Sequence, residues 1–276
     1  MVESRHVYGM LEATEGKTAS SVLSDALKRQ VLAFQEYTYV VARAISNIFT
    51  PPLYWTDTLE QMDIIGVGSL PIVMLAGFFI GVVLVLQTSA EFERFGEAAL
   101  TGQGVSLALV RELGPVITAL LVAGRNSSGI ASEIGSMVVT EQVDAMRALG
   151  TDPMRKLITP RIIATVLMLP LLVVIADFIG LVGGFLAAYF TLHLSGSEFW
   201  HRAINVLAFG DLVQGITKPI LFGLIVASVG CYQGLTVRGG TQGVGRATTT
   251  AVVIASLAII VSDTVLSRLL LFMFTR

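Results

Sequence analysis

Long uncharged stretches alternate with short charged ones along this chain. The first uncharged stretch covers residues 64–87. As a helix that rises 1.5 Å per residue, it is long enough to cross a hydrocarbon core of about 30 Å. Four more apolar blocks follow, at about residues 104–124, 162–194, 219–237 and 247–276. The pattern predicts an all-α membrane protein with about five transmembrane helices.

A few charged residues interrupt these blocks. Arg111 and Glu112 lie in the second block, Asp177 in the third and Asp263 in the fifth. Charges inside a span are costly and are commonly functional. Adjacent residues on a helix point about 100° apart, so Arg111 and Glu112 are expected to have separate roles. Either each pairs with a charge on another span, such as Asp177 or Asp263, or one or both face a polar cavity.

An amphipathic segment precedes the first span. Its apolar residues recur at near-helical spacing: Leu23, Leu27, Val31, Phe34, Val41, Ile45 and Ile48. Interspersed charges make it too polar to span a bilayer, so we predict an interfacial helix; packing on a soluble partner is the alternative. Pro51 and Pro52 end the helix. The predicted domains are a polar tail (1–20), an interfacial amphipathic helix (21–50) and a transmembrane domain (51–276).

Composition supports the membrane class. Of the 276 residues 54% are hydrophobic and 14% are charged, against about 25% charged in soluble domains. The net charge of −2 gives no reason to expect nucleic acid. Cys231, the single cysteine, excludes an internal disulfide, and the three histidines are too scattered to suggest a metal site. The first twenty residues lack the pattern of a cleaved signal peptide.

Basic residues indicate the orientation. The loop between the second and third blocks carries Arg125, Arg147, Arg155, Lys156 and Arg161, and the loop between the fourth and fifth carries Arg238 and Arg246. The other two loops are poorer in basic residues and hold Glu91, Glu93, Arg94 and Glu97, and Glu198, Arg202 and Asp211. Cytoplasmic loops are rich in Lys and Arg, so we expect the two basic loops and the N-terminal helix to be cytoplasmic and the C-terminus external.

Glycines form two kinds of pattern. Pairs at four-residue spacing, which permit close helix contacts within one chain or between two, are Gly77 with Gly81, Gly180 with Gly184, and Gly230 with Gly234. Residues 240–245 imitate the glycine spacing of a phosphate-binding loop. Arg246 and Ala247 stand where that loop needs Lys and Ser or Thr, so no ATP site is expected here.

The loop between the second and third blocks contains a short helix pattern. Thr140 is a plausible N-cap, followed by Glu141 and Gln142 in the first turn. Apolar residues at spacings of three follow: Val143, Met146 and Leu149. Gly150 can supply a left-handed C-terminal cap. The pattern predicts a short amphipathic helix that either inserts into a groove of a partner protein or packs beneath its own spans.

Several long motifs resemble one family. They are RELGPVITALLVAGR at residues 111–125, ASEIGSMVVTEQVDAMRALGTDP at 131–153, Pro160 with Arg161, and GRATTTAVV from Gly245. They closely resemble the MlaE/YrbE permeases of phospholipid ABC transporters. The resemblance covers most of the chain from about residue 60 onward.

The resemblance implies a function and a set of partners. The chain would be a permease subunit in a bacterial inner membrane, paired with a second copy of itself, two cytoplasmic ATPase subunits and an outer partner with a mammalian-cell-entry (MCE) domain. It would move phospholipids between membranes, bind no cofactor directly and use MgATP through the ATPase. Arg111 and Glu112 would line a lipid pocket at the dimer interface. The resemblance also implies a coupling helix for the ATPase, with these residues: Thr140, Glu141, Gln142, Val143, Asp144, Met146, Arg147 and Leu149.

Two other classes compete with the permease. A secondary transporter would couple protons or ions through Glu112, Asp177 or Asp263. An intramembrane enzyme is disfavoured, because the spans contain no Ser-His, His-Glu-x-x-His or paired-aspartate motif.

Overall fold

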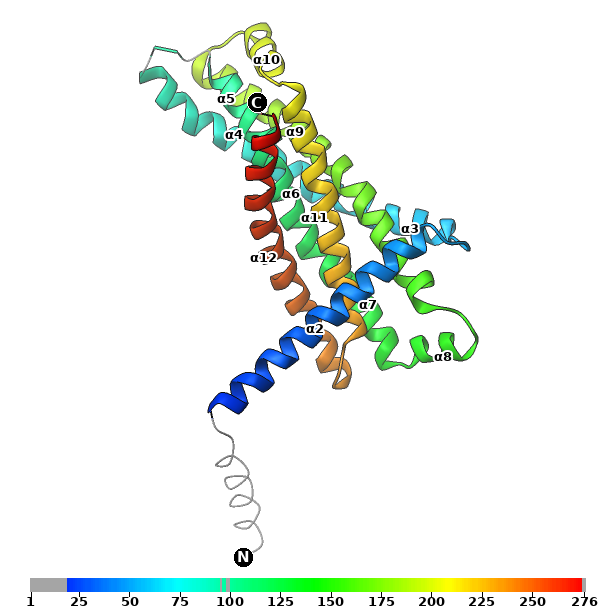
Figure 1. Cartoon of the computed structure of the whole chain (residues 1–276). Coiled ribbons are helices and arrows are strands. Elements are labelled where there is room, and N and C mark those ends of the chain that lie inside the picture. Colours follow the sequence, from blue (N-terminus) through cyan, green and yellow to red (C-terminus); the bar gives the residue numbers. More distant parts are fainter. Residues whose placement is uncertain (1–18, 95, 98–99, 275–276) are drawn as a thin grey trace, which may run out of the picture. The chain divides into compact units, whose positions relative to one another are not determined.

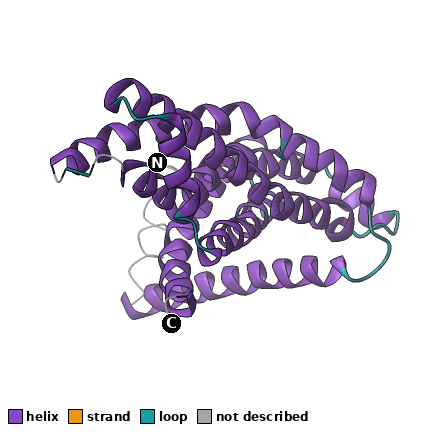
Figure 2. Ribbon diagram, turned by 90° about the horizontal axis from the view of Figure 1, so that it is seen from above, coloured by secondary structure: helices purple, strands orange, loops and turns teal. Residues whose placement is uncertain are grey.

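The computed structural model describes residues 19–94, 96–97 and 100–274 and divides into two compact units, residues 1–43 and 44–276. Helix α2 (Ala19–Ile48) covers most of the segment predicted as an amphipathic helix. The tail predicted for residues 1–20 falls almost wholly outside the described residues. Throughout the described part the chain forms helices and loops without a strand (Figure 2).

The unit of residues 44–276 contains five helical runs long and apolar enough to cross a membrane. The first consists of α3 (Trp55–Ile65), η1 (Val67–Ser69) and α4 (Leu70–Arg94). The second consists of α5 (Thr101–Ala108), η3 (Leu109–Leu113), α6 (Gly114–Val122), η4 (Ala123–Ser127) and α7 (Ser128–Val139). The third comprises η5 (Met154–Ile158) and α9 (Thr159–Leu192), the fourth α11 (Phe209–Leu235) and the fifth α12 (Gly240–Phe274). The predicted fold class is confirmed.

Two short helices lie at opposite ends of this bundle (Figure 1). Helix α8 (Gln142–Ala148) connects the second and third runs, and α10 (Gly196–Asn205) connects the third and fourth. We use the terms α8 end and α10 end for the two ends of the bundle.

The helical runs extend beyond the predicted blocks, which moves several charged residues out of predicted loops. Arg125 belongs to η4 and Arg161 to α9, so neither is in the loop between the second and third runs. Asp211, assigned to an external loop, lies in the first turn of α11. Those predictions were wrong because the block boundaries were set at Arg125, Arg161 and Lys218. The helices continue through these charged residues, since helical backbone makes its hydrogen bonds internally.

The paired glycines serve contacts within the chain. A Cβ on Gly81 would lie 1.8 Å from the carbonyl oxygen of Gly180, and one on Gly77 would lie 2.7 Å from that of Ala176, so α4 and α9 touch backbone to backbone. A Cβ on Gly230 would lie 2.9 Å from the carbonyl oxygen of Ser127, where α11 meets the second run. These contacts favour packing within one chain over a dimer seam for these glycines.

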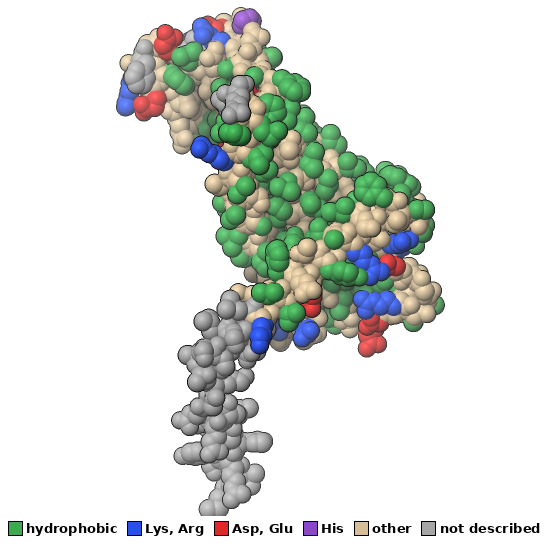
Figure 3. Space-filling model, in the orientation of Figure 1, with side chains coloured by type: hydrophobic (Ala, Val, Ile, Leu, Met, Phe, Trp, Pro, Cys, Tyr) green, Lys and Arg blue, Asp and Glu red, His purple; other side chains and the backbone are tan. Residues whose placement is uncertain are grey.

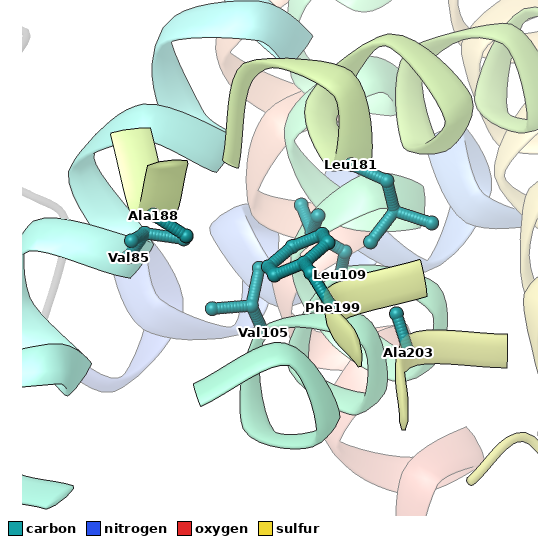
Figure 4. Close-up of a cluster of buried hydrophobic side chains, with 7 residues drawn as sticks. All are labelled: Val85, Val105, Leu109, Leu181, Ala188, Phe199 and Ala203. Atoms are coloured by element: carbon teal, nitrogen blue, oxygen red, sulfur yellow. The ribbon is translucent and has the colours of Figure 1, made fainter. Parts of the chain in front are cut away.

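An apolar cluster closes the bundle at the α10 end. Figure 4 shows seven buried side chains that point toward one another: Val85, Val105, Leu109, Leu181, Ala188, Phe199 and Ala203. They come from α4, α5, η3, α9 and α10. Helix α10 is capped by the Ser195 hydroxyl, which accepts a hydrogen bond from the Glu198 amide. It buries Phe199 and Ala203 beneath a polar outer face.

The surface of the runs matches a membrane environment. On the face shown in Figure 3, charged side chains gather toward the two ends, and hydrophobic side chains cover much of the area between. Exposed large hydrophobics include Leu75 and Phe79 on α4 and Leu257 and Val261 on α12. In water such a surface would be unfavourable, whereas lipid tails cover it without cost.

Candidate functional site

Lys218 lies at the centre of a polar cluster inside the bundle. Its side chain, on α11, is fully buried. The Nζ atom donates to Glu112 Oε2 at 2.6 Å, to the Arg111 carbonyl oxygen at 2.8 Å and to Ser267 Oγ at 2.8 Å. Asp263 Oδ1 on α12 lies 3.0 Å from the same nitrogen. One lysine thus joins η3, α11 and α12.

A second ion pair lies beside it. Arg111 Nε donates to Asp211 Oδ1 at 2.6 Å, and the other oxygen of Asp211 accepts the Ala208 amide at 2.9 Å. Asp211 and Lys218 are seven residues apart, so they lie on one face of α11, two turns from each other. We call Arg111, Glu112, Asp211, Lys218, Asp263 and Ser267 the charge cluster.

The π-helical turn η3 determines how Arg111 and Glu112 are presented. Both residues lie within it, and such turns are frequent at functional sites. The two side chains meet different partners, Asp211 and Lys218, as expected for neighbours with separate roles. The two side chains therefore pair with charges on another span, which is one of the two alternatives. Asp263 takes part only through Lys218, and Asp177 forms no ion pair with Arg111 or Glu112.

The cluster is deep in the spans and open on one side. Arg111 lies ten residues after Thr101, the start of the second run, which is about 15 Å along the helix. The side chains of Lys218 and Asp211 are 0% and 4% exposed, whereas those of Arg111 and Glu112 are 37% and 42% exposed. The two predicted pocket residues therefore form the accessible edge of a buried ionic network.

Sequence reasoning missed Lys218 and the role of Asp211. Both precede Pro219, where the fourth block was taken to begin. Proline inside α11 does not end that helix, which starts at Phe209. The signal was the seven-residue spacing, which puts an acid and a base on the same face of a continued helix.

The short helix predicted between the second and third blocks exists as α8, with a different start. Thr140 ends α7, because its hydroxyl donates to the Ser136 carbonyl at 2.8 Å, so its assignment as N-cap was wrong. Glu141 takes a left-handed backbone with φ of 61° and therefore precedes α8 instead of lying in its first turn. The C-terminus is as predicted: Gly150 has φ of 79°, and the Thr151 amide donates to the Met146 carbonyl.

The residues of α8 and its two flanking positions differ in how far they are buried. Val143 is 3% exposed and packs within the chain, and Met146 is half-buried. Leu149 is 83% exposed. Polar residues on the outside include Asp144 and Arg147, which form an ion pair at 2.9 Å, together with Glu141 and Gln142.

Ionic contacts hold the helices next to α8. Arg161 on α9 donates to Glu133 on α7 at 2.8 Å. Lys156 on η5 pairs with Asp57 on α3, and Arg155 donates to the Pro51 carbonyl at 3.0 Å.

The described residues contain no group of three or more His, Cys, Asp or Glu side chains arranged to hold a metal ion.

Five apolar helical runs with a buried ionic network define a multi-pass helical membrane protein. Residues 58–269 match the family model described as Permease MlaE. The chain belongs to the MlaE permease family.

Curated relatives agree with that assignment. A probable ABC transporter permease protein of Rickettsia typhi is 43% identical over 82% of this chain and 88% of its own length. A probable ABC transporter permease protein of Synechocystis is 39% identical over 90% of this chain and 93% of its own. The chloroplastic protein TRIGALACTOSYLDIACYLGLYCEROL 1 of Arabidopsis thaliana is 32% identical over 96% and 82%. The chain is a transmembrane permease subunit of the ABC type, which implies ATPase partner subunits.

Proposed function

We propose that this permease moves phospholipids between inner and outer membranes, and that two copies form a homodimer with a lipid pocket at their interface. The observation that carries the proposal is the half-exposed edge of the charge cluster. A charge near the bilayer centre costs at least about 2.5 kcal/mol on insertion scales, so Arg111 and Glu112 need a polar neighbour rather than lipid tails. A second copy facing this edge encloses it.

The two exposed side chains suit a phospholipid head group. The guanidinium of Arg111 binds Asp211 through Nε, and its planar fork is suited to phosphate oxygens. The carboxylate of Glu112 holds Lys218 through Oε2 and can also meet a head-group amine. The exposed hydrophobic surface of the spans is suited to acyl chains.

Helix α8 is the proposed coupling helix. The partner ATPase binds and hydrolyses MgATP, and the permease binds no cofactor itself. Leu149 is the apolar residue available to a groove of that partner, with Met146 beside it. Glu141, Gln142, Asp144 and Arg147 would form the polar rim, Val143 the buried base and Thr140 the preceding turn.

The orientation follows from the basic residues near α8. We place the α8 end and the N-terminus in the cytoplasm, and the α10 end and the C-terminus outside a bacterial inner membrane. An MCE-domain partner would receive or deliver lipid at the α10 end.

The test of the pocket uses substitutions that keep a hydrogen-bond partner for Asp211 and for Lys218. Arg111→Lys preserves a cation for Asp211 but removes the fork, and Glu112→Gln preserves an acceptor for Lys218. A charge-assisted hydrogen bond contributes about 1.5–3 kcal/mol, so we expect about tenfold less phospholipid to co-purify with each variant in nanodiscs, and slower ATP-driven transfer. Wild-type lipid content in both variants would remove these residues from the pocket. Arg94→Lys, on an exposed surface pair, is the control.

The test of docking uses Leu149→Asp. We expect at least tenfold less ATPase to co-purify, because a carboxylate enters an apolar contact, while insertion remains normal. Ser197→Asp at the α10 end is the matched control. Undiminished ATPase binding by Leu149→Asp would contradict the docking role.

A further inference from the structure

Asp177 is a buried carboxyl group that the charge cluster does not include. It lies in the middle of α9 and is 9% exposed. Its Oδ1 atom has no hydrogen-bond partner among the described residues. The carboxyl group lies directly against α6, because a Cβ on Gly114 would come within 1.7 Å of Oδ1. Only a glycine leaves room for this contact.

The cavity beside Asp177 is lined by no other ionisable residue. A small cavity of about 10 Å³ adjoins it, and Asp177 is the one ionisable residue in its lining. Helix α4 contributes Val73, Ala76 and Gly77, and the second run contributes Leu113 and Thr118. At this cavity the carboxyl group therefore faces two other spans, whose side chains in the lining are apolar or neutral.

Both cations of the charge cluster are already paired with other carboxylates. Arg111 binds Asp211, and Lys218 binds Glu112 and Asp263. A cavity of this size admits about one water molecule at most, so a hydrated metal ion does not fit. An uncompensated carboxylate away from water is among the costliest groups that a membrane protein can bury. A dehydrated metal ion would find too few oxygen ligands in this apolar lining, whereas a proton needs only a carboxyl oxygen.

We propose that Asp177 is a proton-binding site and remains a neutral carboxylic acid, acting as a positioning residue between α9 and the second run. Gly114 directly follows η3, the turn that carries Arg111 and Glu112. A neutral side chain seated against Gly114 fixes α9 at the base of that turn. A carboxylate in the same place would draw in water or pull a cation from the charge cluster.

This assignment opposes the carrier mechanism considered from the sequence, in which an intramembrane carboxylate gains and loses a proton in each cycle. It does not depend on the identity of the transported lipid. Labelling and spectroscopy therefore test it separately from the pocket proposed above.

The first test is labelling of the complete transporter in nanodiscs with dicyclohexylcarbodiimide, an apolar reagent that adds to protonated carboxyl groups. We expect an adduct on the peptide containing Asp177, located by mass spectrometry, and none in Asp177→Asn. Asp263 is the matched control: it is an acid on a span but lies 3.0 Å from Lys218, so it should stay unlabelled. Labelling of Asp263 with Asp177 unmodified would overturn the proposal.

The second test is infrared difference spectroscopy with a transport assay. The wild-type protein should show the carbonyl band of a protonated carboxylic acid, and Asp177→Asn should lose it. Asparagine has nearly the same volume and is always neutral, so ATP-driven transport should stay within about twofold of wild type. A folded Asp177→Asn protein with transport reduced tenfold or more would show that the carboxyl group must ionise, and would refute a permanently protonated role.

Discussion

Replacing Lys218 with methionine removes the one cation that holds Glu112 and Asp263 together. Methionine has a similar length and keeps the apolar stem of the side chain. The change leaves two carboxylates facing each other across the space that Nζ occupied, with Ser267 Oγ as a remaining donor to Glu112 at 3.1 Å. The Arg111 carbonyl loses a hydrogen bond as well.

The size of the effect follows from the burial of Lys218. Removing one partner of a buried ion pair destabilises by about 3–5 kcal/mol, because the remaining charge is left without compensation. That corresponds to a loss of at least about a hundredfold in the folding equilibrium. We expect the midpoint of thermal unfolding of the detergent-solubilised permease to fall by on the order of 10 °C.

The assay is thermal unfolding followed by the loss of the monodisperse peak in size-exclusion chromatography. Arg94→Met is the control, since its pair with Glu91 is 74% and 64% exposed and contributes about 0–1 kcal/mol. The double variant Lys218→Met with Asp263→Asn should recover part of the loss, because it removes one of the unpaired charges. If Lys218→Met unfolds at the same temperature as Arg94→Met, the network does not stabilise the bundle.

Two further predictions concern packing and topology. Gly81→Ala should destabilise the bundle by about 1–3 kcal/mol in the same assay, because its Cβ would lie 1.8 Å from a backbone oxygen of α9. Gly129→Ala is the control: its Cβ would meet no atom within 4 Å, so this variant should be as stable as the wild type or more stable. Equal stability of the two variants would contradict the close contact of α4 with α9. Cysteines introduced at Thr151 and Thr241 should be protected from an impermeant thiol reagent in intact cells, and one at Ser197 should react; the reverse pattern would invert the proposed orientation.

The sequence was informative where a property is local. Uncharged windows of sufficient length predicted all five helical runs, and the glycine at position 150 predicted the left-handed end of α8. Both depend on residues within one turn or one span. The boundaries were less accurate, because an isolated charge was taken as the end of a span.

The charge cluster was beyond such reasoning. Lys218 and Glu112 are separated by 106 positions, and Arg111 and Asp211 by 100, so their pairing depends on how the spans pack. Thr140 shows a second kind of failure. A threonine is suited both to the start of a helix and to its last turn, so its type alone did not decide between them. In the structure the Thr140 hydroxyl donates to the Ser136 carbonyl of the preceding helix, α7.

One helical run connects the proposed ATPase contact with the charge cluster. Thr101–Val139 carries Arg111 and Glu112 within its first third and leads into α8 at its other end. Two π-helical turns, η3 and η4, interrupt the α-helical hydrogen bonding of this run. Both turns make polar contacts with other spans. In η3 the Arg111 carbonyl accepts from Lys218, and in η4 the Arg125 side chain donates to Ser69 at 3.0 Å. If α8 is displaced, we expect the run to deform first at these two turns, because their hydrogen bonding already departs from that of an α-helix. We expect motion driven at α8 to reach the proposed lipid pocket chiefly as rotation of η3. Such a rotation would change the partners of Arg111 and Glu112 and could thereby bind or release a head group.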